Sequence, residues 1–201
     1  MMNWAKKAAF AAASLAVGVG VVAAPATAQE TGFRPEIELR PFVGAYVPTG
    51  DQRDLVKDAV LVGSTLAVRA TPALTVTGGF GWSPTEERPR ITGDNTVDLF
   101  QYDVGLELGR DLALGRTSWS WRPFIGAGAG GRTYHYRDLD VDAETDFAGY
   151  GAAGVQFDAG RVGLRFEGRD YVSSFDGLQG EMAESAARND LFLVGALMLR
   201  F

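Results

Sequence analysis

Apolar side chains recur at every second position in segments of about ten residues along most of the chain. Within residues 100–108 the even positions are aromatic or aliphatic, whereas the odd positions carry Gln101, Asp103, Gly105 and Glu107. Successive side chains of a β-strand point to opposite faces. This period of two therefore predicts a strand with one apolar and one polar face.

The same period predicts about eight strands along the chain. Their expected bounds are residues 37–47, 59–70, 73–83, 97–108, 121–130, 147–158, 161–171 and 190–201. Long polar connectors, at 48–58, 84–96, 137–146 and 174–189, alternate with shorter ones at 71–72, 109–118 and 159–160. This alternation is typical of an up-and-down array of antiparallel hairpins.

The polar faces of these segments hold glycine together with charges of both signs, and arginine is the base. Arginine forks onto carboxylates through two hydrogen bonds, which suits a confined network. We expect the glycines to leave room for long side chains reaching across a narrow tube. We therefore predict a luminal ion-pair network formed by Glu38, Arg40, Arg69, Asp103, Glu107, Arg122, Arg165, Glu167 and Arg169.

Two architectures could cover the apolar face of such strands. A soluble sandwich would bury it in a core. A transmembrane barrel would turn it toward lipid, and closure of the barrel would satisfy every backbone group without leaving an edge. The mixed charges on the polar face favour the second. The expected fold class is all-β: an eight-stranded antiparallel up-and-down transmembrane β-barrel.

The start of the chain differs from the rest in pattern. Two lysines precede an apolar run over residues 8–24, and a small-residue A-x-A sequence follows at 26–28. This order is typical of a cleaved secretory signal peptide, with a membrane anchor as the alternative. We expect residues 1–28 to be the signal peptide and residues 29–201 to be the barrel domain.

Composition excludes several classes of function. The net charge is −6, and removal of a leader containing two lysines would make it more negative, which argues against nucleic acid as a partner. No cysteine is present, so disulfides and thiolate metal sites are excluded. The single histidine, His135, excludes most histidine-based metal sites. No metal and no cofactor are expected.

The chain closes on a nearly unbroken apolar run, LFLVGALMLRF, at residues 191–201. The leucines at 191, 193, 197 and 199 share one register with Phe201. As a last barrel strand, this segment would face lipid along that register. Its terminal aromatic would lie at the water boundary, where barrels carry aromatic girdles.

The apparent signal peptide, the alternating segments and the final strand together resemble the small outer-membrane β-barrel superfamily, which includes the OmpA-like transmembrane barrels. The resemblance spans essentially all of residues 29–201. It implies the outer membrane of a Gram-negative-type bacterium, with both ends of the barrel in the periplasm. It also implies that the barrel assembly machinery reads Leu197, Leu199 and Phe201 as a C-terminal signal. We expect a monomer.

Residues 126–131, GAGAGG, satisfy the G-x-G-x-x-G spacing of dinucleotide-binding loops. Binding of a pyrophosphate at such a loop requires a helix to follow. The next residues, 132–136, are aromatic and strand-like. We therefore expect these glycines to form part of the barrel wall.

His135 leaves an enzymatic interpretation open. Some barrels of this size hydrolyse or transfer acyl chains of lipid A with a histidine, a serine and an acid near the outer leaflet. His135 has Asp138 close by in sequence, but no serine can be paired with it from the sequence. The alternative is that residues 134–136 contribute to an interfacial aromatic girdle.

The long connectors carry both acids and bases. The stretch RDLDVDAETD at residues 137–146 has carboxylates at alternate positions, but it lacks the glycine and the final glutamate of a calcium loop. The basic residues could instead pair with phosphates of lipopolysaccharide. The candidates for such contacts are Arg53, Lys57, Arg88, Arg90 and Arg137.

These features favour a structural or interaction role for a small barrel whose lumen is plugged by ion pairs and whose long loops are exposed. Outer-membrane lipid and lipopolysaccharide would be its surroundings. A narrow pore or small-solute carrier is the first alternative. A lipid A-modifying enzyme that uses His135 is the second.

Overall fold

In the computed structural model, the strands of the barrel lie within Arg34–Phe201. The expected signal peptide lies outside the described residues. Among those residues no helix is long and apolar enough to cross a bilayer. The structure describes residues 33–49, 57–87, 95–113, 115, 119–137, 143–175 and 186–201.

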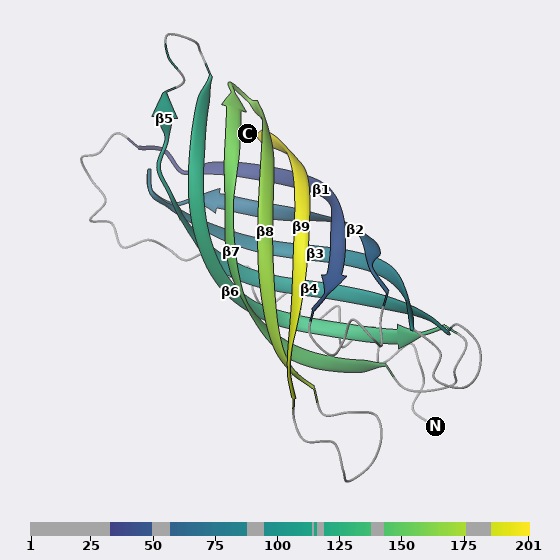
Figure 1. The fold of residues 1–201 in the computed structure, drawn as a ribbon. Helices are drawn as coiled ribbons and strands as arrows, with labels where there is room; N and C mark the ends of the chain where they lie inside the picture. Colours follow the sequence, from purple (N-terminus) through teal and green to yellow (C-terminus); the bar gives the residue numbers. More distant parts are fainter. Residues whose placement is uncertain are drawn as a thin grey trace. The chain divides into compact units, whose positions relative to one another are not determined.

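The described residues fold into antiparallel strands that close on themselves (Figure 1). Each long strand pairs with its neighbours in sequence, and the pairing of β1 with β9 joins the two ends of the series. β4 pairs directly with β6, which completes an eight-stranded barrel, while β5 is a short addition to β6. The strands are β1 (Glu36–Pro48), β2 (Ala59–Arg69), β3 (Leu74–Glu87), β4 (Asn95–Gly109), β5 (Leu112–Ala113), β6 (Ser120–Tyr136), β7 (Glu144–Ala159), β8 (Val162–Phe175) and β9 (Ala186–Arg200).

The two ends of the barrel differ. At the end that holds the start of β1 and the end of β9, here called the terminal end, short turns connect β2 to β3 and β7 to β8, and the connection from β4 to β6 carries β5. The hydroxyl of Thr71 accepts a hydrogen bond from the Leu74 amide at 2.9 Å in one of them. In another, Gly160 has a φ of 69°, which glycine adopts without steric cost. The long connectors leave from the opposite end, here called the loop end.

Most strands extend further toward the loop end than the sequence pattern indicated. β3 continues to Glu87, β6 to Tyr136 and β8 to Phe175. Backbone pairing continues here beyond the apolar alternation, with polar cross-strand contacts such as the Thr133 and Thr145 hydroxyls at 2.8 Å. Alternation marked the apolar part of each strand rather than its full length.

The outer wall of the barrel is apolar and its interior is charged, which confirms the expected fold class. Ile125 and Phe147 are 64% and 70% exposed, whereas Glu38 and Arg132 are both 0% exposed. We call the outward apolar side chains the outer belt. It includes Leu39, Val43, Val60, Leu66, Val76, Phe80, Val104, Leu106, Ile125, Phe147, Leu164, Phe166, Leu193 and Leu197.

The interior is not polar throughout, and here the sequence prediction was incomplete. Toward the loop end, an apolar and aromatic cluster lies in the lumen. Tyr134, considered for an interfacial girdle, packs against this cluster instead. Inward apolar residues look the same as outward ones in the sequence, so only the strand register separates them. The cluster contains Tyr46, Leu61, Leu99, Ala148, Tyr150, Tyr171 and Phe192.

Several inward glycines make room for aromatic rings on nearby strands. A Cβ added at Gly105 would lie 2.1 Å from the Tyr150 hydroxyl, and one at Gly128 would lie 2.5 Å from the same ring. Gly154 has the same relation to Phe124 at 2.5 Å. The GAGAGG segment thus lies within β6 as barrel wall, as expected, and no dinucleotide-binding loop forms there.

Candidate functional site: the luminal charge network

All nine residues expected in the luminal network have buried side chains, between 0% and 8% exposed. They come from five strands: β1, β2, β4, β6 and β8. Each lies at an inward position of its strand, between outward residues of the outer belt. Strand alternation therefore brings charges that are far apart in sequence into one enclosed volume.

The centre of the network is Glu107 on β4. Arg40 contacts Glu38 at 2.6 Å and Glu107 at 3.1 Å. Glu107 also accepts a hydrogen bond from Arg165 at 2.6 Å. A single carboxylate thus joins an arginine of β1 to an arginine of β8 across the lumen.

The series of alternating charges continues along β8. Arg165 contacts Glu167 at 2.8 Å, and Glu167 accepts a second hydrogen bond from Arg169. Arg169 in turn contacts Asp103 at 3.3 Å. The hydroxyl of Tyr171 donates to Asp103 at 2.9 Å, which connects the charges to the aromatic cluster.

Toward the terminal end, Arg200 extends the same series. Its guanidinium donates to Glu38 at 2.9 Å and also pairs with Asp158. Arg200 lies on the polar face of the last predicted strand, but Asp158 was not among the expected residues. The chain from Asp158 to Asp103 is therefore continuous, and each interior charge in it contacts neighbours of opposite sign.

Two further expected arginines meet at a turn residue. Arg69 and Arg122 each contact Asp111 at 3.2 Å. Arg122 also donates to the carbonyls of Pro72 and Ala73, at 2.8 and 3.1 Å. Asp111 lies in a connector, where no strand alternation could indicate its role. We define the luminal network as the nine expected residues with Asp111, Asp158 and Arg200.

A separate buried pair near the loop end was missed. Arg132 on β6 and Asp190 on β9 form an ion pair with both side chains 0% exposed. The Tyr46 hydroxyl donates to Asp190 at 3.2 Å. The guanidinium of Arg132 lies 4.8 Å from the ring centre of Tyr171 and 5.0 Å from that of Phe192, within cation–π range. Both residues lie at alternate positions that continue the inward face of their strands, so the alternation along the sequence could have identified them.

The network places an opposite charge beside each of its buried charges, although Nε and Nη2 of Arg69 have no hydrogen-bond partner. Moving a charge out of water costs several kcal/mol, which only close, well-oriented partners offset. An ion entering this lumen would have to separate such pairs. The arrangement therefore suits a closed plug.

The expected C-terminal signal lies on the outer wall. Leu197 is 42% exposed and Phe201 is 80% exposed, while Leu199 is half-buried. The Phe201 amide donates to the Ile37 carbonyl at 3.0 Å, so the final residue still pairs with β1. These three side chains are presented outward together at the terminal end.

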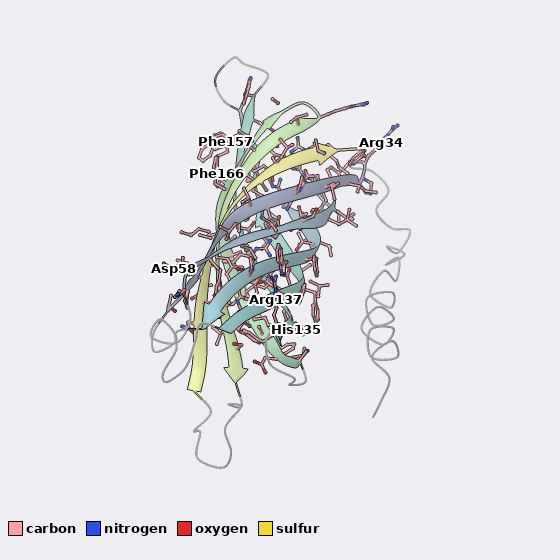
Figure 2. The ribbon with its side chains drawn as sticks, turned by 90° about the vertical axis from the view of Figure 1, so that its right-hand side faces the viewer. Arg34, Asp58, His135, Arg137, Phe157 and Phe166 are labelled. Carbon is pink, nitrogen blue, oxygen red and sulfur yellow. The ribbon has the colours of Figure 1, made fainter. Side chains whose placement is uncertain are left out.

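Of the expected lipopolysaccharide contacts, Arg53, Arg88 and Arg90 lie outside the described residues. Arg137 lies at the end opposite Arg34 (Figure 2). Its guanidinium makes two hydrogen bonds of 2.7 Å with Asp98. Lys57 is half-buried at the same end of the barrel.

His135 is exposed near Arg137 at the loop end (Figure 2). Its register partner on β4 is Asp98. Both oxygens of that carboxylate accept hydrogen bonds from Arg137, and Oδ1 also accepts one from Trp82 at 2.9 Å. The acid nearest in register to His135 is thus held by other donors, and Asp138 lies outside the described residues.

Comparison with known proteins identifies the fold. A family model described as the outer membrane protein beta-barrel domain matches residues 14–195. The crystal structure of neisserial surface protein A is similar, with a TM-score of 0.58 and 12% identity over 84% of this chain and 100% of that one. The solution structure of the E. coli outer membrane protein W gives a TM-score of 0.50 and 17% identity over 85% and 100%. No curated protein matches the sequence.

Proposed function

Because the chain belongs to the outer membrane protein beta-barrel domain family, and so to the outer membrane, we propose that it is a structural or interaction barrel with a closed lumen. The observation that carries this proposal is the continuous series of ion pairs from Asp158 to Asp103. Five of its charges, on β1, β4 and β8, meet around Glu107 and Glu167.

A closed lumen follows from the energetics of the luminal network. Each charge in the middle of the series already has opposite charges within hydrogen-bond distance. A solute or ion would have to replace those contacts with equally good ones while still largely dehydrated. Toward the loop end the lumen also holds the aromatic cluster, together with the buried Arg132–Asp190 pair.

With the lumen closed, the functional surfaces lie at the ends and on the outer wall. Both termini of the barrel would lie in the periplasm, and the four long connectors would then face the outside of the cell. The connectors would serve as contact sites for a partner, while basic side chains near the loop end meet lipopolysaccharide phosphates. During biogenesis, Leu197, Leu199 and Phe201 would be read by the assembly machinery.

Solute flux tests the closed lumen. The purified barrel is inserted into phosphatidylcholine vesicles, which are then diluted into an isotonic solution of a small sugar. The expected swelling rate equals that of protein-free vesicles, with a general porin as the positive control. Swelling that increases with the amount of folded barrel would refute the proposal and favour the narrow-pore alternative.

A further inference from the structure

Asp170 is a charged residue on the lipid-facing side of the barrel. On β8 the outward row includes Phe166, Gly168, Asp170 and Val172, and Asp170 is exposed there. Val172 lies beyond it toward the loop end and is itself 48% exposed, so Asp170 lies within the outer belt. Among the described residues, Asp170 has no hydrogen bond or ion pair.

Asp170 borders a hollow on the outer wall. A depression of about 480 Å³ is lined by Gly151, Ala153, Gly168 and Leu191 together with Asp170. A second depression, of about 510 Å³, shares Gly168 with the first and continues across β9. In Figure 1 β7, β8 and β9 run side by side in this region. We call the outward face of these three strands the β7–β9 face.

Packing within the barrel does not require the glycines of this face. A Cβ at Gly151 would meet nothing within 4 Å, and one at Gly168 would lie 3.7 Å from Leu193. At Gly195 the nearest atom would be 3.9 Å away. These distances are ordinary or open, unlike the clashes at the inward glycines. The small outward residues therefore leave space for something outside the chain.

A carboxyl group on a lipid-facing wall is unfavourable for the barrel alone. The ionised form loses its hydration, and the neutral acid still leaves a hydroxyl and a carbonyl without partners in hydrocarbon. Ionisable residues at such positions mark contact sites whose partner satisfies them. Asp170 therefore needs a hydrogen-bonding group at the same depth in the membrane.

We propose that the β7–β9 face binds a second copy of this chain, with the two Asp170 carboxyls hydrogen-bonded to each other beside a two-fold axis parallel to the barrel axis. A protonated carboxyl donates as well as accepts, so two Asp170 side chains that carry at least one proton between them are self-complementary, as a two-fold interface requires. The outward arginines among the described residues, Arg110, Arg137 and Arg161, lie at the two ends of the barrel and cannot supply a cation at this depth.

The shape of the β7–β9 face fits the same symmetry. Asp170 pairs in register with Gly151 on one side and with Leu191 on the other. A two-fold rotation beside Asp170 exchanges these sides, so that β9 of one copy, with Leu191, faces β7 of the other, with Gly151. Small residues let two membrane-embedded surfaces approach closely. The proposed dimer differs from the monomer expected from the sequence.

Cysteine cross-linking tests the interface, because the chain has no native cysteine. The variants Gly168→Cys and Val104→Cys are each purified and inserted into phosphatidylcholine vesicles at a high lipid ratio. Val104, on β4, is the control because it is 63% exposed on the outer belt but lies outside the β7–β9 face. A short bismaleimide is expected to produce a dimer with Gly168→Cys and none with Val104→Cys.

Substitutions of Asp170 in the Gly168→Cys background separate this contact from non-specific crowding. Asp170→Leu should fold at least as well, because it removes a carboxyl from the lipid face. It should weaken dimerisation about three- to tenfold, the scale of one hydrogen bond between membrane-embedded surfaces. Asp170→Asn, which still donates and accepts, should retain most of the dimer. Far-ultraviolet circular dichroism checks that each variant is folded.

The inference is overturned if the wild-type barrel is monomeric in vesicles, if the two cysteine positions cross-link equally, or if Asp170→Leu dimerises as well as wild type. A dimer with the expected response to Asp170 substitution supports it. None of these outcomes depends on whether the lumen conducts. The proposed dimer and the proposed closed lumen can therefore be refuted independently of each other.

Discussion

Glu107 is the position where the luminal network can be tested most sharply. Its two carboxylate oxygens accept hydrogen bonds from Arg40, at 3.1 Å each, and from Arg165, at 2.6 and 3.3 Å. The substitution Glu107→Gln keeps the size and one acceptor oxygen but removes the charge. It leaves two buried guanidinium groups with one carboxylate fewer.

The expected decrease in the free energy of unfolding follows from those contacts. Removing one partner of a buried ion pair costs about 3–5 kcal/mol. Arg40 keeps Glu38 and Arg165 keeps Glu167, so the loss should lie near the lower limit, about 3 kcal/mol. With a urea dependence of about 2 kcal/mol per molar, the unfolding midpoint would fall by about 1.5 M.

The assay is urea unfolding of the barrel in phosphatidylcholine vesicles, followed by tryptophan fluorescence. Glu36→Gln is the matched control, because Glu36 has a side chain 34% exposed and contacts arginines only at 3.7 and 3.9 Å. The free energy of unfolding of this variant should fall by less than about 1 kcal/mol. If Glu107→Gln shifts the midpoint no more than Glu36→Gln, or raises it, then the network does not stabilise the lumen as argued.

Three further predictions concern other parts of the barrel. Gly105→Ala should lower the unfolding free energy by about 1–3 kcal/mol, because its Cβ would overlap the Tyr150 hydroxyl, whereas Gly151→Ala should change it by less than about 0.5 kcal/mol; urea titration compares the two. His135→Ala should leave the mass spectrum of lipid A from expressing cells unchanged, and a lost modification would revive the enzymatic alternative. Phe201→Ala should reduce the amount of folded barrel in outer membranes while leaving its refolding in vesicles near normal; equal yields in cells would remove the proposed assembly signal.

Strand alternation made the faces of the barrel predictable, because which side a residue faces depends only on its own strand. Glu38 and Arg165 could be placed inside without knowledge of their partners. The partners themselves depend on register and closure, which are not local. That Arg40 meets Glu107 requires β1 and β4 to face each other across a closed lumen.

For the aromatic cluster and for Asp170, the residue type alone did not indicate the environment of the side chain. The inward Tyr46 and Phe192 and the outward leucines of the same strands are all apolar, so composition alone cannot separate them. Asp170 continues the outward register of β8, so its position was readable from parity. That this outward position faces lipid is known only from the closed barrel. Asp111 had no periodic signal at all.

The central claim, a lumen closed by paired charges, is tested most directly by single-channel recording. The purified barrel is added to planar phosphatidylcholine bilayers in 1 M KCl, a salt concentration used only to amplify any current. The account predicts no stable conductance steps from folded protein, while Glu107→Gln shows at most brief openings. Stable channels of uniform size from the wild-type barrel would contradict it.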